Sequence, residues 1–160
     1  MRRRLAATLA AITTLAVASN AQAASSDPVG DLIMSVLTGS LPQGPGWNVK
    51  ATLYHAGAYG VGALDSLGCK VVAMRTAATD KTLIPRRSIL FIKETVGLKM
   101  PGGGRHDGYW YASDVGGKIK GQRIDLYTGH GSSSMKPIMP LNLQKLSAVK
   151  VGDFKGCPPA

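Results

Sequence analysis

Residues 107–129 read DGYWYASDVGGKIKGQRIDLYTG, and they predict two β-strands joined by a glycine-rich turn. The first strand covers residues 109–112, which are aromatic and compact, and the second covers residues 123–127. A strand, a glycine turn and a second strand are typical of an all-β domain. Glycine bends the backbone at little steric cost, so we assign the turn to the segment with Gly116, Gly117 and Gly121.

The second strand carries a carboxylate at an unusual position. Ile124 and Leu126 form its apolar face, so Asp125 between them points the other way. Asp114 stands eleven residues earlier, at the mouth of the turn. Carboxylates are depleted in strands, so Asp125 requires an explanation. One explanation is an ion pair with a basic side chain, and the other is a functional site.

Residues 114–129 resemble the closing motif of the three-aspartate (3D) domain, which is shared with the membrane-bound lytic transglycosylase A family. That motif reads roughly Asp-Thr-Gly-Gly-x-Ile-x-Gly-x-Arg-Ile-Asp-Leu-Tyr/Phe-x-Gly. The chain matches it without gaps at Asp114, Gly116, Gly117, Ile119, Gly121, Arg123, Ile124, Asp125, Leu126, Tyr127 and Gly129.

Two upstream segments resemble other landmarks of the same family. Residues 73–92 resemble the segment that carries the first aspartate, here Asp80, followed by an Ile-Pro pair. The sequence ATLYHAG resembles the first strand, with Thr52 and Tyr54 at its matching positions. The resemblance therefore extends over about residues 50–151.

The resemblance implies a mainly β fold, a small six-stranded double-psi β-barrel over residues 47–160 with one short N-terminal helix before it. Short alternating runs and the 20 glycines of the chain are consistent with a small closed barrel. The glycine-rich loop 56–68 is long for a barrel connection, and we expect it to line a cleft. Further strand segments are predicted at residues 47–55, 71–76, 88–92, 137–143 and 146–151.

The resemblance also implies a carbon–oxygen lyase acting on peptidoglycan, a lytic transglycosylase. In this family, an aspartate at the position of Asp125 is the single acid–base. It protonates the glycosidic oxygen between MurNAc and GlcNAc and then takes the proton of the C6 hydroxyl, which attacks C1 to form 1,6-anhydro-MurNAc. We therefore expect Asp125 and Asp114 to be catalytic, and substrate to be bound by Thr52, Tyr54, Asp80, Gly116, Gly117 and Tyr127.

Such an acid must keep its proton near neutral pH, so its pKa must be raised by burial or by a like charge. Asp114 would supply that charge, or would hold the turn by accepting backbone N–H groups. Asp80 precedes Thr82 in a pattern typical of a turn-capping carboxylate. Glu94 is the single glutamate, so carboxylate chemistry in this chain rests on aspartate.

Three departures from the family leave a second function open. Val115 replaces the usual threonine, and Arg86 with Arg87 replaces the usual Leu-Gly pair. We also expect no second domain of the kind that completes the substrate groove in the family. The alternative is a non-catalytic saccharide-binding or wall-loosening barrel, as in expansin-like relatives. In that case the rings of a bound saccharide would stack on exposed aromatic side chains, drawn from Tyr109, Trp110, Tyr111 and Tyr127.

Two other chemistries have little support in the sequence. His55, His106 and His130 are all predicted to lie in loops, and their spacing does not point to three converging zinc ligands. The G-x-S-x-G pattern of many serine hydrolases does not occur. We therefore expect neither a metal nor a cofactor.

Residues 1–23 are predicted to be a signal peptide. They have a triple-arginine start, an apolar stretch too short to span a bilayer, and an Ala-x-Ala cleavage site. Residues 24–46 follow as a helix, at about 25–39, and a linker. We expect an exported monomer with no transmembrane anchor, in the periplasm or outside the cell and associated with the cell wall.

The charge of the chain favours an anionic partner. Loss of the signal peptide would lower the formal net charge from +10 to about +7. Outside the cytoplasm, this excess favours cell-wall polymers, lipopolysaccharide or membrane surfaces over nucleic acid, although it could also serve solubility alone. We expect peptidoglycan glycan strands as the partner, and no nucleic acid.

Two cysteines, Cys69 and Cys157, remain after the signal peptide. In an oxidising compartment an even pair predicts a disulfide, which here would tie the C-terminal tail to the barrel. Loop-closure entropy gives it a stabilising effect of about 4–5 kcal/mol.

Overall fold

The computed structural model describes residues 44–159. The predicted signal peptide at residues 1–23 and the predicted helix at 25–39 lie outside the described residues, as does the linker up to residue 43. Within the described part, no helix is long and apolar enough to cross a membrane.

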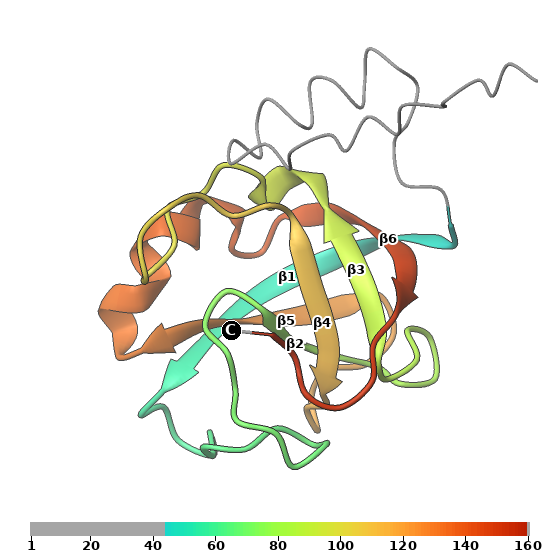
Figure 1. The fold of residues 1–160 in the computed structure, drawn as a ribbon, viewed down its shortest axis with the longest axis horizontal. Coiled ribbons are helices and arrows are strands. Elements are labelled where there is room, and N and C mark those ends of the chain that lie inside the picture. The colour runs from blue at the N-terminus through green and yellow to red at the C-terminus, as the bar shows by residue number, and fades with distance from the viewer. Residues whose placement is uncertain (1–43, 160) are drawn as a thin grey trace, which may run out of the picture.

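Six strands form a closed barrel (Figure 1). The elements are β1 (Gly46–Ala56), β2 (Thr76–Thr79), β3 (Ser88–Ile92), β4 (Tyr109–Asp114), β5 (Arg123–His130) and β6 (Lys145–Asp153), with two 3-10 helices, η1 (Lys93–Thr95) and η2 (Ser132–Leu141). The order around the barrel is β1-β5-β2-β4-β3-β6, and β6 pairs with β1 to close it. The pairs β1–β5 and β2–β4 are parallel and the others are antiparallel. The prediction of a mainly β chain with six strands is confirmed.

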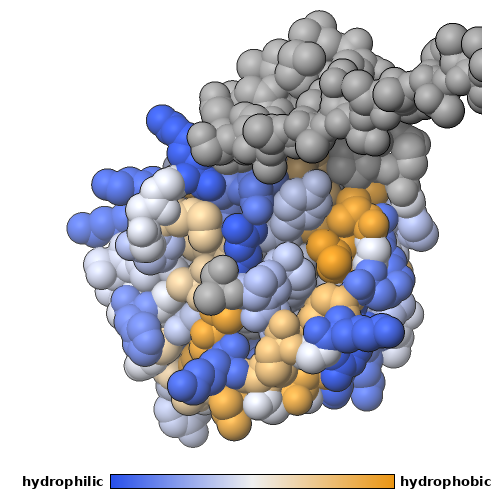
Figure 2. All heavy atoms as spheres, in the orientation of Figure 1, coloured by the Kyte–Doolittle hydropathy of each residue, from blue (hydrophilic) through white to orange (hydrophobic). Residues whose placement is uncertain are grey.

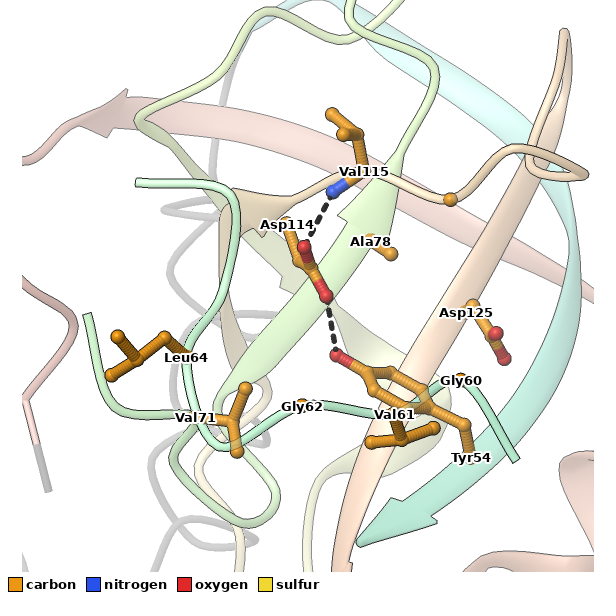
Figure 3. A pocket seen from close by; sticks show the side chains of 11 residues that line it. Tyr54, Gly60, Val61, Gly62, Leu64, Val71, Ala78, Asp114, Val115 and Asp125 are labelled. Carbon is orange, nitrogen blue, oxygen red and sulfur yellow. Dashed lines mark hydrogen bonds between the residues drawn. The ribbon is translucent and has the colours of Figure 1, made fainter. Parts of the chain in front are cut away.

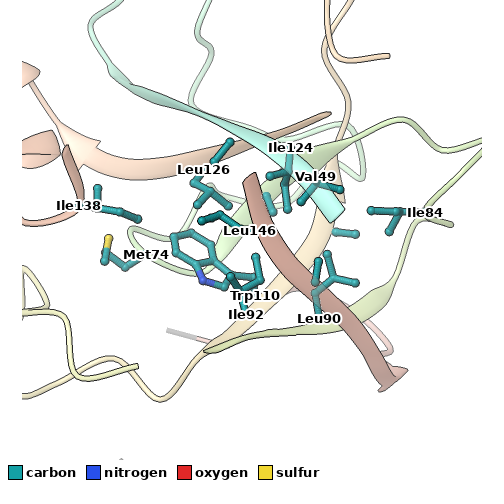
Figure 4. Close-up of a cluster of buried hydrophobic side chains, with 14 residues drawn as sticks. Val49, Met74, Ile84, Leu90, Ile92, Trp110, Ile124, Leu126, Ile138 and Leu146 are labelled. Atoms are coloured by element: carbon teal, nitrogen blue, oxygen red, sulfur yellow. The ribbon is translucent and has the colours of Figure 1, made fainter. Parts of the chain in front are cut away.

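The interior of the barrel is filled by apolar side chains that alternate with outward-facing residues along each strand (Figure 4). Ile124 and Leu126 of β5 point inward, as their alternation predicts. Trp110 of β4 is the largest fully buried side chain, and its indole N–H donates to the Thr95 hydroxyl at 3.0 Å. This bond satisfies the one polar group of the ring. The buried cluster consists of Val49, Ala51, Met74, Ala77, Ile84, Leu90, Ile92, Trp110, Ala112, Ile124, Leu126, Ile138, Leu146 and Ala148.

Two predicted strand segments are wrong. Residues 71–76 form a turn, in which two backbone N–H groups donate to the carbonyl of Val72, and β2 begins only at Thr76. Residues 137–143 fall mainly in η2, which contains two prolines. Proline has no N–H for a sheet ladder and therefore opposes a strand there.

The predicted disulfide is confirmed, because Cys69 and Cys157 are bonded across 88 residues of sequence. The C-terminal tail is also held by Arg87, whose guanidinium donates to the Gly156 carbonyl at 2.9 Å. Arg87 has a φ of +69°, a left-handed backbone that favours glycine. The motif that this segment resembles has a glycine at the position of Arg87.

Candidate functional site

Four residues on neighbouring strands form a row on the outer face of the barrel. Asp125 of β5 lies opposite Ala78 of β2, and Ala78 lies opposite Asp114 of β4. Thr52 of β1 extends the row on the other side of Asp125. The chain neighbour Ile124 is in the core, so Asp125 points outward. The backbones of the two aspartates are thus two strand spacings apart, about 10 Å.

A β-bulge in β4 brings Asp114 to this face. Ala77 pairs with Ala112, but the next residue, Ala78, pairs with Asp114, which leaves Ser113 as the extra residue. Strict alternation would place Asp114 on the same side as the buried Ala112. A bulge re-aims the side chains that follow it, and here it sets Asp114 beside Ala78.

The row opens into a hollow of about 250 Å³ (Figure 3). The loop 56–68, which the sequence predicts to line a cleft, supplies part of its wall, and Tyr54 of β1 points into it between the two aspartates. The lining residues are Tyr54, Gly60, Val61, Gly62, Leu64, Val71, Ala78, Asp114, Val115, Gly116 and Asp125.

Asp114 is held by donors from three segments of the chain. Its Oδ2 accepts the Tyr54 hydroxyl at 3.2 Å, and its Oδ1 accepts the backbone N–H groups of Ser66 at 3.0 Å and Val115 at 2.8 Å. Burial, followed by the charge of Asp114, raises the pKa of Tyr54 well above its ordinary value, so the phenol remains a donor. Asp114 therefore fixes β1, the 56–68 loop and the start of the β4–β5 turn around the hollow.

Asp125 has the opposite surroundings. Its Oδ1 is buried and has no hydrogen-bond partner among residues 44–159. Burial raises the pKa of Asp125, and the charge of Asp114 adds to the rise, while Thr52 and Arg123 oppose it. Such a carboxyl keeps its proton to a higher pH than an exposed one, and Asp125 lines the hollow. A retained proton beside a hollow is what a general acid requires.

Asp80 lies outside the hollow and braces the turn between β4 and β5. Its Oδ1 accepts the N–H and the hydroxyl of Thr82, and its Oδ2 accepts the N–H of Gly121 at 2.8 Å. The bond from Gly121, followed by those from Thr82, lowers the pKa of Asp80 to about 2. The turn-capping expectation is therefore confirmed, and the structure adds that this carboxylate reaches the glycine turn.

The two glycines expected to bind substrate differ. Gly116 lines the hollow, and a Cβ there would lie 2.6 Å from Cγ1 of Ile119, so no larger residue fits. Gly117 is outside the lining, and its Cβ position is open. The structure thus brings Gly116, and not Gly117, to the site.

Two other expected substrate-binding residues lie beside the hollow rather than in its lining. The Thr52 hydroxyl donates to the Ile124 carbonyl at 3.3 Å. Tyr127 packs against Tyr54, with ring centroids 5.2 Å apart, and lines the neighbouring hollow. The structure therefore groups Asp125, Asp114, Tyr54 and Gly116 directly, with Thr52 and Tyr127 behind them.

Sequence reasoning missed Ala78 and Val71. Ala78 separates the two aspartates, and its small side chain keeps the space between them open. No local pattern marks such a residue, because its position depends on which strands pair.

The histidines and most of the aromatic side chains lie elsewhere. The prediction that all three histidines lie in loops is wrong, since His55 is in β1 and His130 ends β5, while His106 is in a loop but fully buried. Trp110 is in the core, and Tyr109 and Tyr111 pack against phenylalanines. Among residues 44–159, no group of three or more His, Cys, Asp or Glu side chains is arranged to hold a metal ion.

Comparison with protein families confirms the resemblance seen in the sequence. Residues 75–137 match the family model of the 3D domain. The match covers β2 to β5 and the first part of η2, and so includes Asp80, Asp114 and Asp125. No curated protein matches the chain.

Several solved structures are similar to this chain. The lytic transglycosylase MltA of Escherichia coli with bound chitohexaose is 22% identical, with a TM-score of 0.42, over 61% of this chain and 30% of that one. The lytic transglycosylase LtgG of Burkholderia pseudomallei is 24% identical, with a TM-score of 0.39, over 55% and 25%. MltA of Neisseria gonorrhoeae is 20% identical, with a TM-score of 0.40, over 59% and 23%. The chain thus spans less than a third of the length of these proteins.

Proposed function

We propose that this barrel is an exported lytic transglycosylase-like protein that cleaves the MurNAc–GlcNAc bond of peptidoglycan with formation of 1,6-anhydro-MurNAc. The observation that carries the proposal is Asp125, a carboxyl with a raised pKa and an unpartnered oxygen at a hollow that it shares with Asp114. The match to the 3D domain and the ungapped motif around both aspartates support it.

In this proposal Asp125 acts twice. The protonated carboxyl donates its proton to the glycosidic oxygen as the C1–O bond breaks, and GlcNAc leaves with a restored hydroxyl. The carboxylate then takes the proton of the C6 hydroxyl of the same muramyl ring, whose oxygen bonds to C1. No water is consumed and Asp125 ends protonated again. One acid–base group of this kind commonly contributes about 10²–10⁴ in rate.

Asp114 has two roles in this scheme. Asp114 and Asp125 lie on either side of Ala78. The negative charge of Asp114 therefore helps to keep the proton on Asp125. The same charge stabilises the positive charge that develops at C1 during cleavage. Its three donors hold it in place, so it need not move during the reaction.

The same proposal includes the type of barrel, export from the cytoplasm and the monomeric state. The two parallel strand pairs of the closed barrel support the double-psi type over residues 47–160. The disulfide supports export, by a signal peptide at residues 1–23, to the periplasm or the cell exterior. We propose a monomer that works on glycan strands at the cell wall.

One observation favours the non-catalytic alternative. The hollow at Asp125 measures about 250 Å³, below the range of about 300–1,000 Å³ usual for ligand pockets. A saccharide-binding barrel could hold one sugar hydroxyl with Asp125 and perform no chemistry.

Purified sacculi distinguish the two functions. Incubation with the protein lacking residues 1–23 should release soluble fragments that end in 1,6-anhydro-MurNAc, identified by mass spectrometry. Retention of the protein on sacculi without any anhydro product would instead establish the binding function.

A further inference from the structure

The hollow at Asp125 is one of several neighbouring hollows. It shares Val61, Gly62, Leu64 and Val71 with a second hollow of about 480 Å³. The second hollow shares His130 with a third of about 550 Å³, formed between η2 and the loop at residues 97–106. The third shares Lys99 with a fourth beside Arg105. Each hollow therefore borders the next through at least one shared lining residue.

The charged residues in the lining differ between the first hollow and the other three. The first hollow holds both aspartates, whereas the lining of the other three contains no Asp or Glu. Those three are lined instead by basic side chains, which we call the basic arm: Lys70, Lys99, Arg105, His130 and Lys136. In Figure 1, η2 and the 97–106 loop lie at the left, and hydrophilic side chains project along the left edge of Figure 2.

The basic arm is available to an external anion. All five side chains are exposed, and within residues 44–159 none of them forms an ion pair. Lys99 and Arg105 are paired across an isolated β-bridge. Like charges directly opposite each other are unfavourable, and a bound anion would relieve the repulsion.

The lining of the third hollow indicates which anion fits. It includes Ala73, Met100, Pro101 and Pro137 together with Lys99 and Lys136, so apolar surface and two lysines belong to one hollow. A bare phosphate chain would gain nothing from the apolar part of this lining. A peptide with carboxylates on aliphatic side chains would use both the apolar surface and the lysines.

We propose that the basic arm holds the acidic peptide substituent of the muramyl sugar whose glycosidic bond lies at Asp125. The inference rests on the proposed function, because it places the sugar in the first hollow. It adds that this barrel prefers peptide-bearing glycan to naked glycan, and that the preference comes from ion pairing outside the cleavage site.

Binding, measured apart from cleavage, tests the inference. Asp125→Asn serves as the parent, so that no turnover disturbs the equilibrium. Two probes are titrated by calorimetry at low salt: a GlcNAc–MurNAc disaccharide with its acidic peptide, and the same disaccharide with the peptide removed. We expect Lys99→Ala with Lys136→Ala to weaken binding of the first probe about tenfold and to leave the second unchanged.

The matched control is Lys145→Ala with Lys155→Ala, which removes two exposed lysines that line none of the four hollows. The inference is overturned if the control weakens binding equally, or if both probes bind the parent alike. If the wild type releases no anhydro sugar while the lysine effect on the first probe persists, the proposed function fails and the peptide site stands.

Discussion

Asp125 and Asp107 are both partly buried aspartates, but their surroundings shift their pKa values in opposite directions. Burial alone would raise the pKa of Asp107, but hydrogen bonds from Arg75 and from the Tyr109 N–H, together with the Arg75 charge, lower it. Asp125 has an oxygen without a partner, and burial raises its pKa.

The environment of Asp107 is a closed polar network. Arg75 forms an ion pair with Asp107 and also donates to the Tyr109 carbonyl at 3.0 Å. The neighbouring His106 accepts the Gly108 N–H on Nδ1 at 2.8 Å. Its Nε2 lies 2.6 Å from the carbonyl oxygen of Met74, and its ring stacks on Trp110 of the core. Every group has a partner, so the network stabilises the fold. A buried carboxyl that lacks partners costs stability and is a candidate for function.

The largest expected effect belongs to Asp125→Asn. The amide has nearly the same shape but no transferable proton, so release of anhydro-muropeptides should fall by about 10²–10⁴. The raised pKa means that ionising Asp125 disfavours the fold above that pKa, so the neutral amide should leave the melting temperature unchanged or higher. Mass spectrometry of the products and thermal unfolding measure the two quantities. Retained turnover, or loss of turnover through unfolding, would show that Asp125 is not the acid–base.

Asp107→Asn should give the reverse pattern. The substitution leaves Arg75 without its charged partner, and removing one member of a partly exposed pair should destabilise the protein by about 1–3 kcal/mol. Urea unfolding measures the loss. Activity per folded molecule should stay at the wild-type level, because Asp107 is not in the lining of the hollow. A loss of turnover in fully folded Asp107→Asn would break the contrast between the two aspartates.

The buried His106 should make the stability of the fold sensitive to acid. Burial lowers the pKa of His106 below its ordinary value of about 6.5, with the Arg75 charge adding to the effect. Its stabilising contribution is therefore fully present above pH 6.5 and is lost as the pH falls toward the lowered pKa. We expect on the order of 1–2 kcal/mol less stability at pH 5 than at pH 7 by urea unfolding. His106→Gln should be less stable at pH 7 and should lack this dependence. An unchanged dependence in that variant would assign the titration to another group.

Ala78→Val should give the smallest effect and tests the row directly. Two added methyl groups would occupy space between the aspartates, so activity should fall about tenfold. The strand should tolerate the change, because β-branched residues suit β-sheets and Ala78 lines the hollow, outside the core cluster. Ala78→Ser, which is nearly as small, is the control and should stay within about twofold of the wild type. Full activity in Ala78→Val would place the reacting sugar elsewhere.

The sequence was a good guide wherever a signal is local. Alternation in β5 separates the inward Ile124 and Leu126 from the outward Asp125, and the core confirms it. The even pair of cysteines predicts the observed disulfide. The pattern after Asp80 predicts its capping of Thr82. The strand alternation and the Asp80 turn depend on residues close in sequence, and two cysteines allow only one pairing with each other.

The tertiary structure decided the features that depend on pairing between distant segments. The bulge at Ser113 turns Asp114 outward, and the register sets Ala78 between the two aspartates. The prolines of η2 override its apolar strand-like pattern, and the packing of His106 against Trp110 buries a residue that its glycine-rich neighbours mark as a surface loop. The sequence by itself therefore singled out Asp114 and Asp125 as candidate site residues. Only barrel closure decided which aspartate is fully bonded and which keeps a free oxygen, because hydrogen-bond partners come from strands and loops far away along the chain.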